Sequence, residues 1–170
     1  MSSALRQSLY ALAAGLAVAG GVWFMLPKSQ PPPQALALLD DGSRIVYVEP
    51  GAGFYGVERK SARRWAWAGG PATLVLRRLD PGTDPLTVRL RFDLHCLPPR
   101  EVTLRHGDFI LWKGLLSEKK TPVDIPVFTL TGPVTELTLT SDRPGVQLEG
   151  SPDTRLLDFA VYDFEIGAAD

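Results

Sequence analysis

The chain has 170 residues, of which 45% are hydrophobic, 22% charged and 9% aromatic. This length and composition indicate one globular domain with an appendage and argue against two domains of full size. Eighteen Lys and Arg residues against 19 Asp and Glu create no overall positive field, which argues against nucleic acid as a partner. The single cysteine, Cys96, excludes an internal disulfide and a multi-cysteine zinc site.

Residues 9–26 form an apolar run without a formal charge, preceded by Arg6 and followed by Lys28. As a helix this run is about 27 Å long, close to the roughly 30 Å of the bilayer hydrocarbon. We therefore expect a cytoplasmic amino terminus at residues 1–8 and a transmembrane helix at residues 9–26, oriented by the preceding positive charge. The alternative is a cleaved signal peptide, because residues 17–19 have the small-x-small form. The apolar run continues past that site, which favours retention.

Small residues recur within the predicted span. Ala13, Ala17 and Gly21 stand four residues apart, so they share one helix face that lets another helix approach closely. The alternative is that these residues face lipid without a helix partner. Residues 27–34 contain three consecutive prolines and are expected to form a short, stiff linker of polyproline II type.

Residues 35–170 are predicted to form an extracytoplasmic β-domain. Residues 86–94 alternate strictly between apolar and polar side chains, as expected of a strand with one wet face. Further predicted strands cover residues 44–49, 72–78, 102–105, 109–113, 125–130, 137–140 and 159–166. No long helical pattern follows residue 26, so the sequence predicts an all-β antiparallel sandwich, jelly-roll-like, with about 8–10 strands behind the transmembrane helix.

Charge is uneven along this domain. Residues 57–105 carry ten basic and five acidic groups, whereas residues 121–170 carry two basic and nine acidic groups. Antiparallel sheets interleave distant strands, so one interpretation is mutual neutralisation on solvated faces. The other is a basic patch that faces lipid headgroups or an acidic partner.

Residues typical of familiar hydrolases are scarce. The chain has two histidines, His95 and His106, and lacks the GxSxG, HExxH, CxxC and GxxxxGK[ST] motifs. His95 and Cys96 are neighbours on a predicted strand, so their side chains should point to opposite faces. We therefore expect a protein that is not an enzyme, with no catalytic residues, no metal and no cofactor.

An aromatic and charged segment near residue 60 contains the candidate ligand-binding or partner-binding residues. These are Phe54, Tyr55, Glu58, Arg64, Trp65 and Trp67. Aromatic rings offer flat faces for the C–H groups of sugars, and the charged groups can hydrogen-bond to hydroxyls. In the alternative interpretation the rings fill the space between the sheets and Glu58 pairs with Arg64.

This segment also supports a resemblance to a known family. Gly53 to Glu58 has the form G-F-x-x-x-E and is followed by the pair Arg64-Trp65 and an L-x-L strand, while residues 153–157 have the form D-x-R-x-L. In this order they resemble the jelly-roll or galactose-binding-like β-sandwich domains appended to bacterial membrane glycosyltransferases. The chain contains no multispanning catalytic part, so the resemblance implies no transferase activity. Asp153 and Arg155 are expected to be a structural pair that fixes a turn.

These observations predict a non-catalytic accessory or scaffolding subunit in the bacterial cytoplasmic membrane. A single helix would hold the sandwich on the periplasmic side, where it contacts a larger integral membrane protein complex. The expected partners are that complex and the lipid bilayer, with a glycan as a further candidate and no nucleic acid. The alternative function is a carbohydrate-binding module for envelope glycans.

Overall fold

The computed structural model describes residues 34–79 and 84–169. All of them belong to the compact unit Pro31–Asp170. The predicted cytoplasmic terminus, the transmembrane helix with Ala13, Ala17 and Gly21, and most of the linker lie outside the described residues. Within the described ranges there is no helix of the length and hydrophobicity needed to span a membrane.

The described residues form eleven strands and no helix. The strands are β1 (Ala37–Asp40), β2 (Ile45–Pro50), β3 (Phe54–Lys60), β4 (Arg63–Ala68), β5 (Ala72–Arg78), β6 (Leu86–Cys96), β7 (Arg100–His106), β8 (Phe109–Leu116), β9 (Thr121–Leu130), β10 (Val134–Ser141) and β11 (Phe159–Ala168).

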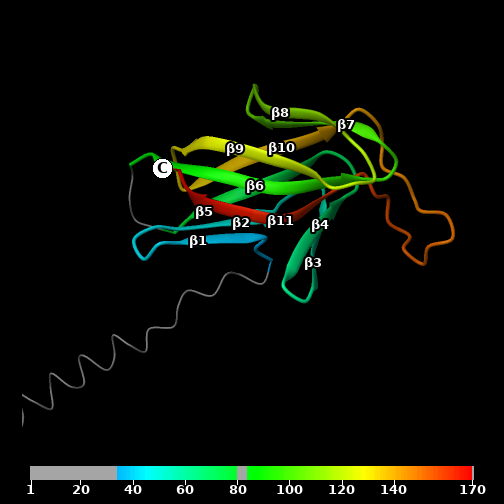
Figure 1. Cartoon of the computed structure of the whole chain (residues 1–170), viewed down its shortest axis with the longest axis horizontal. Coiled ribbons are helices and arrows are strands. Elements are labelled where there is room, and N and C mark those ends of the chain that lie inside the picture. The colour runs from blue at the N-terminus through cyan, green and yellow to red at the C-terminus, as the bar shows by residue number, and fades with distance from the viewer. Residues whose placement is uncertain (1–33, 80–83, 170) are drawn as a thin grey trace, which may run out of the picture. The chain divides into compact units, whose positions relative to one another are not determined.

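The strands pair into two antiparallel sheets, which confirms the predicted all-β sandwich. Sheet A has the order β1-β2-β5-β10-β7-β8, and sheet B has the order β3-β4-β11-β6-β9. The chain crosses from one sheet to the other repeatedly, as in jelly rolls. Figure 1 shows β6, β9 and β11 side by side, with the β3–β4 hairpin projecting beside them. Sheet B therefore places β11, the last strand, between β4 and β6.

The inward faces of the two sheets form the main core. In β6 the side chains of Val88, Leu90 and Leu94 are fully buried, and the intervening Arg89 and Arg91 face outward. Burying each such apolar side chain contributes about 1.5–3 kcal/mol. The alternation of apolar and polar residues in the sequence of β6 thus matches the alternation of buried and outward-facing side chains.

The strand count exceeds the predicted eight to ten, because β1, β3 and β4 were not among the predicted strands. β1 has only four residues, too few for an alternating pattern. β4 has buried alanines on one side and tryptophans on the other, so both of its faces are largely apolar and alternation is lost. Hairpins of this kind are hard to predict from periodicity.

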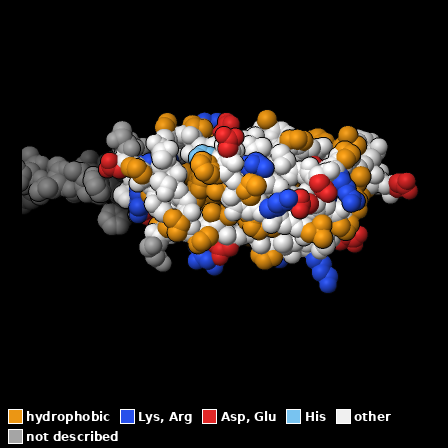
Figure 2. All heavy atoms as spheres, turned by 90° about the horizontal axis from the view of Figure 1, so that it is seen from above, with side chains coloured by type: hydrophobic (Ala, Val, Ile, Leu, Met, Phe, Trp, Pro, Cys, Tyr) orange, Lys and Arg blue, Asp and Glu red, His pale blue; other side chains and the backbone are white. Residues whose placement is uncertain are grey.

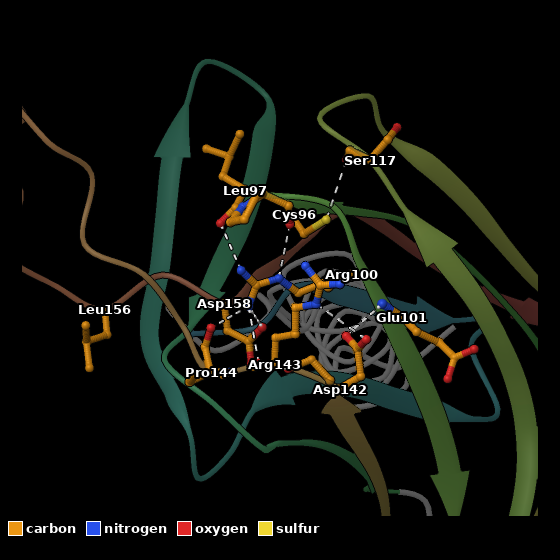
Figure 3. A network of polar contacts seen from close by, with 12 residues as sticks. Cys96, Leu97, Arg100, Glu101, Ser117, Asp142, Arg143, Pro144, Leu156 and Asp158 are labelled. Atoms are coloured by element: carbon orange, nitrogen blue, oxygen red, sulfur yellow. Dashed lines mark hydrogen bonds and ion pairs between the residues drawn. The ribbon is translucent and has the colours of Figure 1, made fainter.

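A buried ion pair closes one end of the sandwich (Figure 3). The guanidinium of Arg100 donates to the carboxylate of Asp158, and both side chains are almost completely buried. The same guanidinium donates to the backbone carbonyls of Leu97 (3.0 Å), Pro98 (3.2 Å) and Pro144 (3.1 Å). Ser141 Oγ donates to the second oxygen of Asp158 at 2.6 Å. The Asp158 backbone N–H donates to the Ala68 carbonyl at 2.8 Å, so this network fixes β11 beside the end of β4.

Ion pairs join the basic and the acidic parts of the sequence. Arg89 lies 2.5 Å from Asp124, and Arg91 lies 3.4 Å from the same carboxylate. In the view of Figure 2, basic and acidic side chains lie next to one another with hydrophobic side chains scattered among them. These pairs favour mutual neutralisation over much of the surface.

Candidate functional site

The outward-facing side of sheet B, called here the outer face of sheet B, holds a cluster of aromatic residues. In β4, Ala66 and Ala68 point into the core. The alternation of a strand therefore directs Trp65 and Trp67 to the outer face. There they join a separate hydrophobic cluster with Ala160 of β11.

Strand register sets one row of side chains across this face. Glu58 of β3 stands opposite Trp65, and Trp65 stands opposite Tyr162 of β11. Tyr162 in turn stands opposite Asp93 of β6. Directly opposed residues in antiparallel strands share a face, so the row brings an acid, two aromatic rings and a second acid together.

The rings of the cluster touch in defined geometries. Trp65 and Tyr162 are stacked, with ring centroids 5.8 Å apart and planes 14° apart. Trp67 meets Tyr162 edge to face at 6.4 Å and meets His95 at 5.7 Å. The ammonium group of Lys120 lies 4.3 Å from the centroid of Tyr162, within the range of a cation–π interaction. Each ring of the cluster therefore contacts at least one neighbouring ring.

Glu58 and Arg155 link this cluster to the loop before β11. Glu58 accepts hydrogen bonds from Trp65 Nε1 at 3.1 Å and from Arg155 Nη1 at 2.8 Å. Arg155 also donates to Asp153 at 2.7 Å. Hydrogen bonds to Asp153 and Glu58 raise the pKa of Arg155, and hydrogen bonds from Arg155 lower the pKa of Asp153. The two acids therefore hold Arg155 charged beside the aromatic rings.

An open groove of about 520 Å³ lies beside Trp65. It is lined by the β3–β4 turn at residues 60–63 together with Trp65, Lys120 and Tyr162. Two smaller grooves, of about 330 and 170 Å³, follow the same face along β6 and β11. Small-ligand sites span about 300–1,000 Å³, so the groove beside Trp65 is large enough for one or a few sugar rings.

The candidate residues from the sequence do not all meet on this face. Three of them, Glu58, Trp65 and Trp67, lie together on the outer face of sheet B. Tyr55 is 47% exposed and donates its hydroxyl to the Leu156 carbonyl at 2.9 Å, and the Arg155 guanidinium lies 5.3 Å from its ring centroid.

Phe54 and Arg64 lie elsewhere. Phe54 packs on the main core and meets Phe159 edge to face at 6.3 Å. Arg64 donates to the backbone carbonyl of Ala35 at 2.7 Å, so the Glu58–Arg64 pair of the alternative interpretation does not form. Glu58 pairs with Arg155 instead.

Sequence reasoning missed Tyr162, His95 and Lys120 as neighbours of the tryptophans. Tyr162 lies in a strand that the sequence predicts, but only the order of strands in sheet B places it against Trp65. No signal in the local sequence reveals that pairing. Among the described residues, no group of three or more His, Cys, Asp or Glu side chains is arranged to hold a metal ion.

Comparisons with known proteins add little to this geometry. No family model matches the chain, and no curated protein matches it. A solved structure described as "CBM4 structure and function" resembles it at 8% identity, covering 73% of this chain and 86% of that one, with a TM-score of 0.36. A likeness this weak carries no functional argument. The glycosyltransferase context suggested by the sequence stays a prediction.

Proposed function

We propose that the domain is a carbohydrate-binding module whose ligand lies on the outer face of sheet B, in the groove beside Trp65. The observation that supports this function is the stacked pair of Trp65 and Tyr162 on the wall of an open groove. Rigid aromatic side chains contribute large contact areas at a low entropic cost. The function requires binding and no catalytic step.

Polar groups beside the rings are suited to sugar hydroxyls. Asp93 and Glu58 belong to the same row as Trp65 and Tyr162, and Lys120 lies on the groove wall. A flat apolar surface with a few fixed donors and acceptors is the usual composition of a small-ligand site. Each of these polar groups is held by a neighbour, so little ordering is needed when a ligand binds.

Isothermal titration calorimetry tests the proposal on the full chain in mild detergent, with a panel of neutral and acidic oligosaccharides. We expect Trp65→Ala to weaken binding at least about tenfold, equivalent to about 1.4 kcal/mol. Trp112→Ala is the matched control, because Trp112 lies on β8 of sheet A and packs on the main core. Thermal unfolding of each variant checks that the fold is intact.

Two outcomes would contradict this function. One is that no oligosaccharide of the panel binds the folded chain. The other is that binding is lost equally in Trp65→Ala and in the control, which would place the ligand away from the groove.

A second candidate function is that of a membrane-anchored accessory subunit on the periplasmic side of the cytoplasmic membrane. The observation that favours it is the edge strand β8, where Phe109, Ile110 and Leu115 are 76%, 53% and 75% exposed. Among the described strands β8 has a neighbour on one side only, so its outer edge offers a partner both exposed apolar side chains and backbone groups.

Affinity purification of the tagged chain in mild detergent tests this second function. We expect a defined integral membrane protein complex to co-purify, and Phe109→Ser with Leu115→Ser to release it. Recovery of the chain alone under gentle extraction would contradict this role.

A further inference from the structure

The charged side chains that line the groove beside Trp65 are all basic, while the acids Glu58 and Asp93 belong to the adjoining row. Its lining includes three basic side chains, Lys60, Arg63 and Lys120, and no acidic one. The groove of about 330 Å³ on the same face includes Asp93, Asp124, Asp163 and Glu165 in its lining. The basic character is thus local to the β3–β4 end of sheet B.

Two of these cations have no acidic partner in the described part of the chain. Lys60 and Arg63 stand opposite each other at the ends of β3 and β4, and both are exposed. Within residues 34–79 and 84–169, neither side chain forms an ion pair. Lys120, on the other side of the groove, is neutralised by Asp163 at 2.6 Å and by Asp93 at 3.8 Å.

Lys60 and Arg63 share the face of Trp65. Arg63 precedes Trp65 by two residues in β4, and Lys60 follows Glu58 by two residues in β3, so all four side chains point outward. A negative group held by the two cations would therefore lie next to the indole ring. An arginine fork can hold a carboxylate or sulfate by two hydrogen bonds.

We propose that the groove selects an anionic carbohydrate, whose carboxylate, sulfate or phosphate group lies between Lys60 and Arg63 while a sugar ring lies against Trp65. This inference rests on the proposed function and specifies its ligand class. Walls of one charge concentrate the potential inside a groove, which favours an acidic sugar over its neutral counterpart.

The structure favours a glycan over an anionic lipid surface. The turn between the two cations contains Ser61 and Ala62 and no large apolar side chain. Phe109 and Leu115 of β8, which are 76% and 75% exposed, lie in sheet A. On the face of the two cations, Trp65 is only partly exposed and stacks on Tyr162. A segment that inserts into a bilayer usually combines basic residues with bulky apolar ones on one face.

Calorimetry on the full chain in mild detergent tests the inference with matched pairs of oligosaccharides. The pairs are galacturonan against its methyl ester, and sulfated against plain dextran. We expect the acidic member of at least one pair to bind at least about tenfold more tightly. Raising the ionic strength from about 0.05 to about 0.5 M should weaken only the acidic member, because salt screens exposed charges.

The variant Lys60→Gln with Arg63→Gln should remove the preference, so that the acidic and the neutral member of a pair bind with similar affinity. The matched control is Arg105→Gln with Lys113→Gln, which removes the same charge from sheet A. This control should keep the preference. Thermal unfolding verifies that both double variants are folded.

Two results would overturn the inference separately from the proposed function. Equal, Trp65-dependent binding of acidic and neutral members would overturn the charge selection and leave carbohydrate binding standing. Binding to phosphatidylglycerol vesicles that is lost in the Lys60/Arg63 variant but kept in Trp65→Ala, with no oligosaccharide bound, would assign the cations to a lipid surface and overturn both.

Discussion

Gly53 and Gly42 adopt the same backbone φ of 85° in different surroundings. A Cβ at Gly53 would lie 2.1 Å from the carbonyl oxygen of Pro71, whereas a Cβ at Gly42 would meet no atom within 4 Å. Gly42→Ala therefore costs only the left-handed conformation, about 1–2 kcal/mol. Gly53→Ala has this cost and also a steric overlap between the new Cβ and the backbone of Pro71, which cannot change rotamer as a side chain can.

We expect Gly53→Ala to lower the free energy of unfolding by at least about 1 kcal/mol more than Gly42→Ala does, since overpacking costs roughly 1–3 kcal/mol. Urea unfolding followed by circular dichroism measures both variants. Equal losses would mean that the turn at Pro71 can move away from Gly53, and would contradict this close packing.

His95 is a second residue whose surroundings decide its behaviour. Its ring packs edge to face against Trp67 and Tyr162, and its Nδ1 is buried with no hydrogen-bond partner in the described part of the chain. Burial lowers the pKa of His95 below its ordinary value of 6.5, and the charge of Lys120 acts in the same direction. A hydrogen bond with the Glu118 backbone opposes this shift in part.

The depressed pKa of His95 predicts a loss of stability in mild acid. Below pH 6.5, His95 is protonated in the unfolded chain. In the folded chain it stays neutral until the pH falls below its lowered pKa, so the unfolded state is favoured over this range. One such proton costs at most about 1.4 kcal/mol of stability per pH unit. We expect the free energy of unfolding to fall less between about pH 7.5 and about pH 5.5 in His95→Gln than in the unaltered chain.

His106→Gln is the control for this pH effect, because His106 lies at the end of β7 against Phe128, in a different part of the sandwich. Its pH dependence should follow that of the unaltered chain. If His95→Gln keeps the full acid sensitivity, other groups are responsible for it.

At the scale of the elements, the ion pair of Arg100 and Asp158 ties the turn between β6 and β7 to the entry of β11. Asp158→Ala would leave the buried guanidinium without its counter-charge, and breaking a buried pair on one side costs about 3–5 kcal/mol. Ser141→Ala removes one hydrogen bond to the same carboxylate and should cost about 0.5–1.5 kcal/mol. Thermal and urea unfolding compare the two variants.

A double replacement separates the charge from the packing. Arg100→Met with Asp158→Leu removes both charges and fills similar volume, and buried pairs replaced in this way often lose little stability. We expect it to be more stable than Asp158→Ala alone. If Asp158→Ala loses no more than Ser141→Ala, water reaches Arg100 and the pair is not structural.

The same elements show what the sequence could and could not predict. β6 was predictable because its alternation reports one buried and one wet face. The β3–β4 hairpin was not predictable from alternation. Tryptophans cover the outer side of β4 and alanines its inner side, so its apolar and polar residues do not alternate. The residue types of the candidate site were predictable, but their assembly was not. Trp65 meets Tyr162 only through the order of strands in sheet B.

For the whole domain, the two sheets interleave strands from distant parts of the chain. In sheet A, β10 lies between β5 and β7, and in sheet B, β11 lies between β4 and β6. Acidic groups of the carboxyl-terminal part therefore reach basic groups that precede them by many residues. Glu165 of β11 stands opposite Arg91 of β6, and Asp124 of the edge strand β9 pairs with Arg89. Lys60 and Arg63 lie at the tip of the β3–β4 hairpin, away from these acidic groups. They make the groove beside Trp65 locally basic.

The attachment of the whole chain to a membrane is the remaining prediction. If residues 9–26 span the bilayer, the full chain should stay in the membrane pellet after an alkaline carbonate wash, and its mass should include residue 1. A variant without residues 1–30 should appear in the supernatant, because it lacks the predicted span and keeps the unit Pro31–Asp170. Val18→Arg, which costs about 2.5–3.5 kcal/mol at the centre of a span, should reduce the membrane fraction. A mature chain that begins after Ala19 and washes off freely would show a cleaved leader and contradict the anchor.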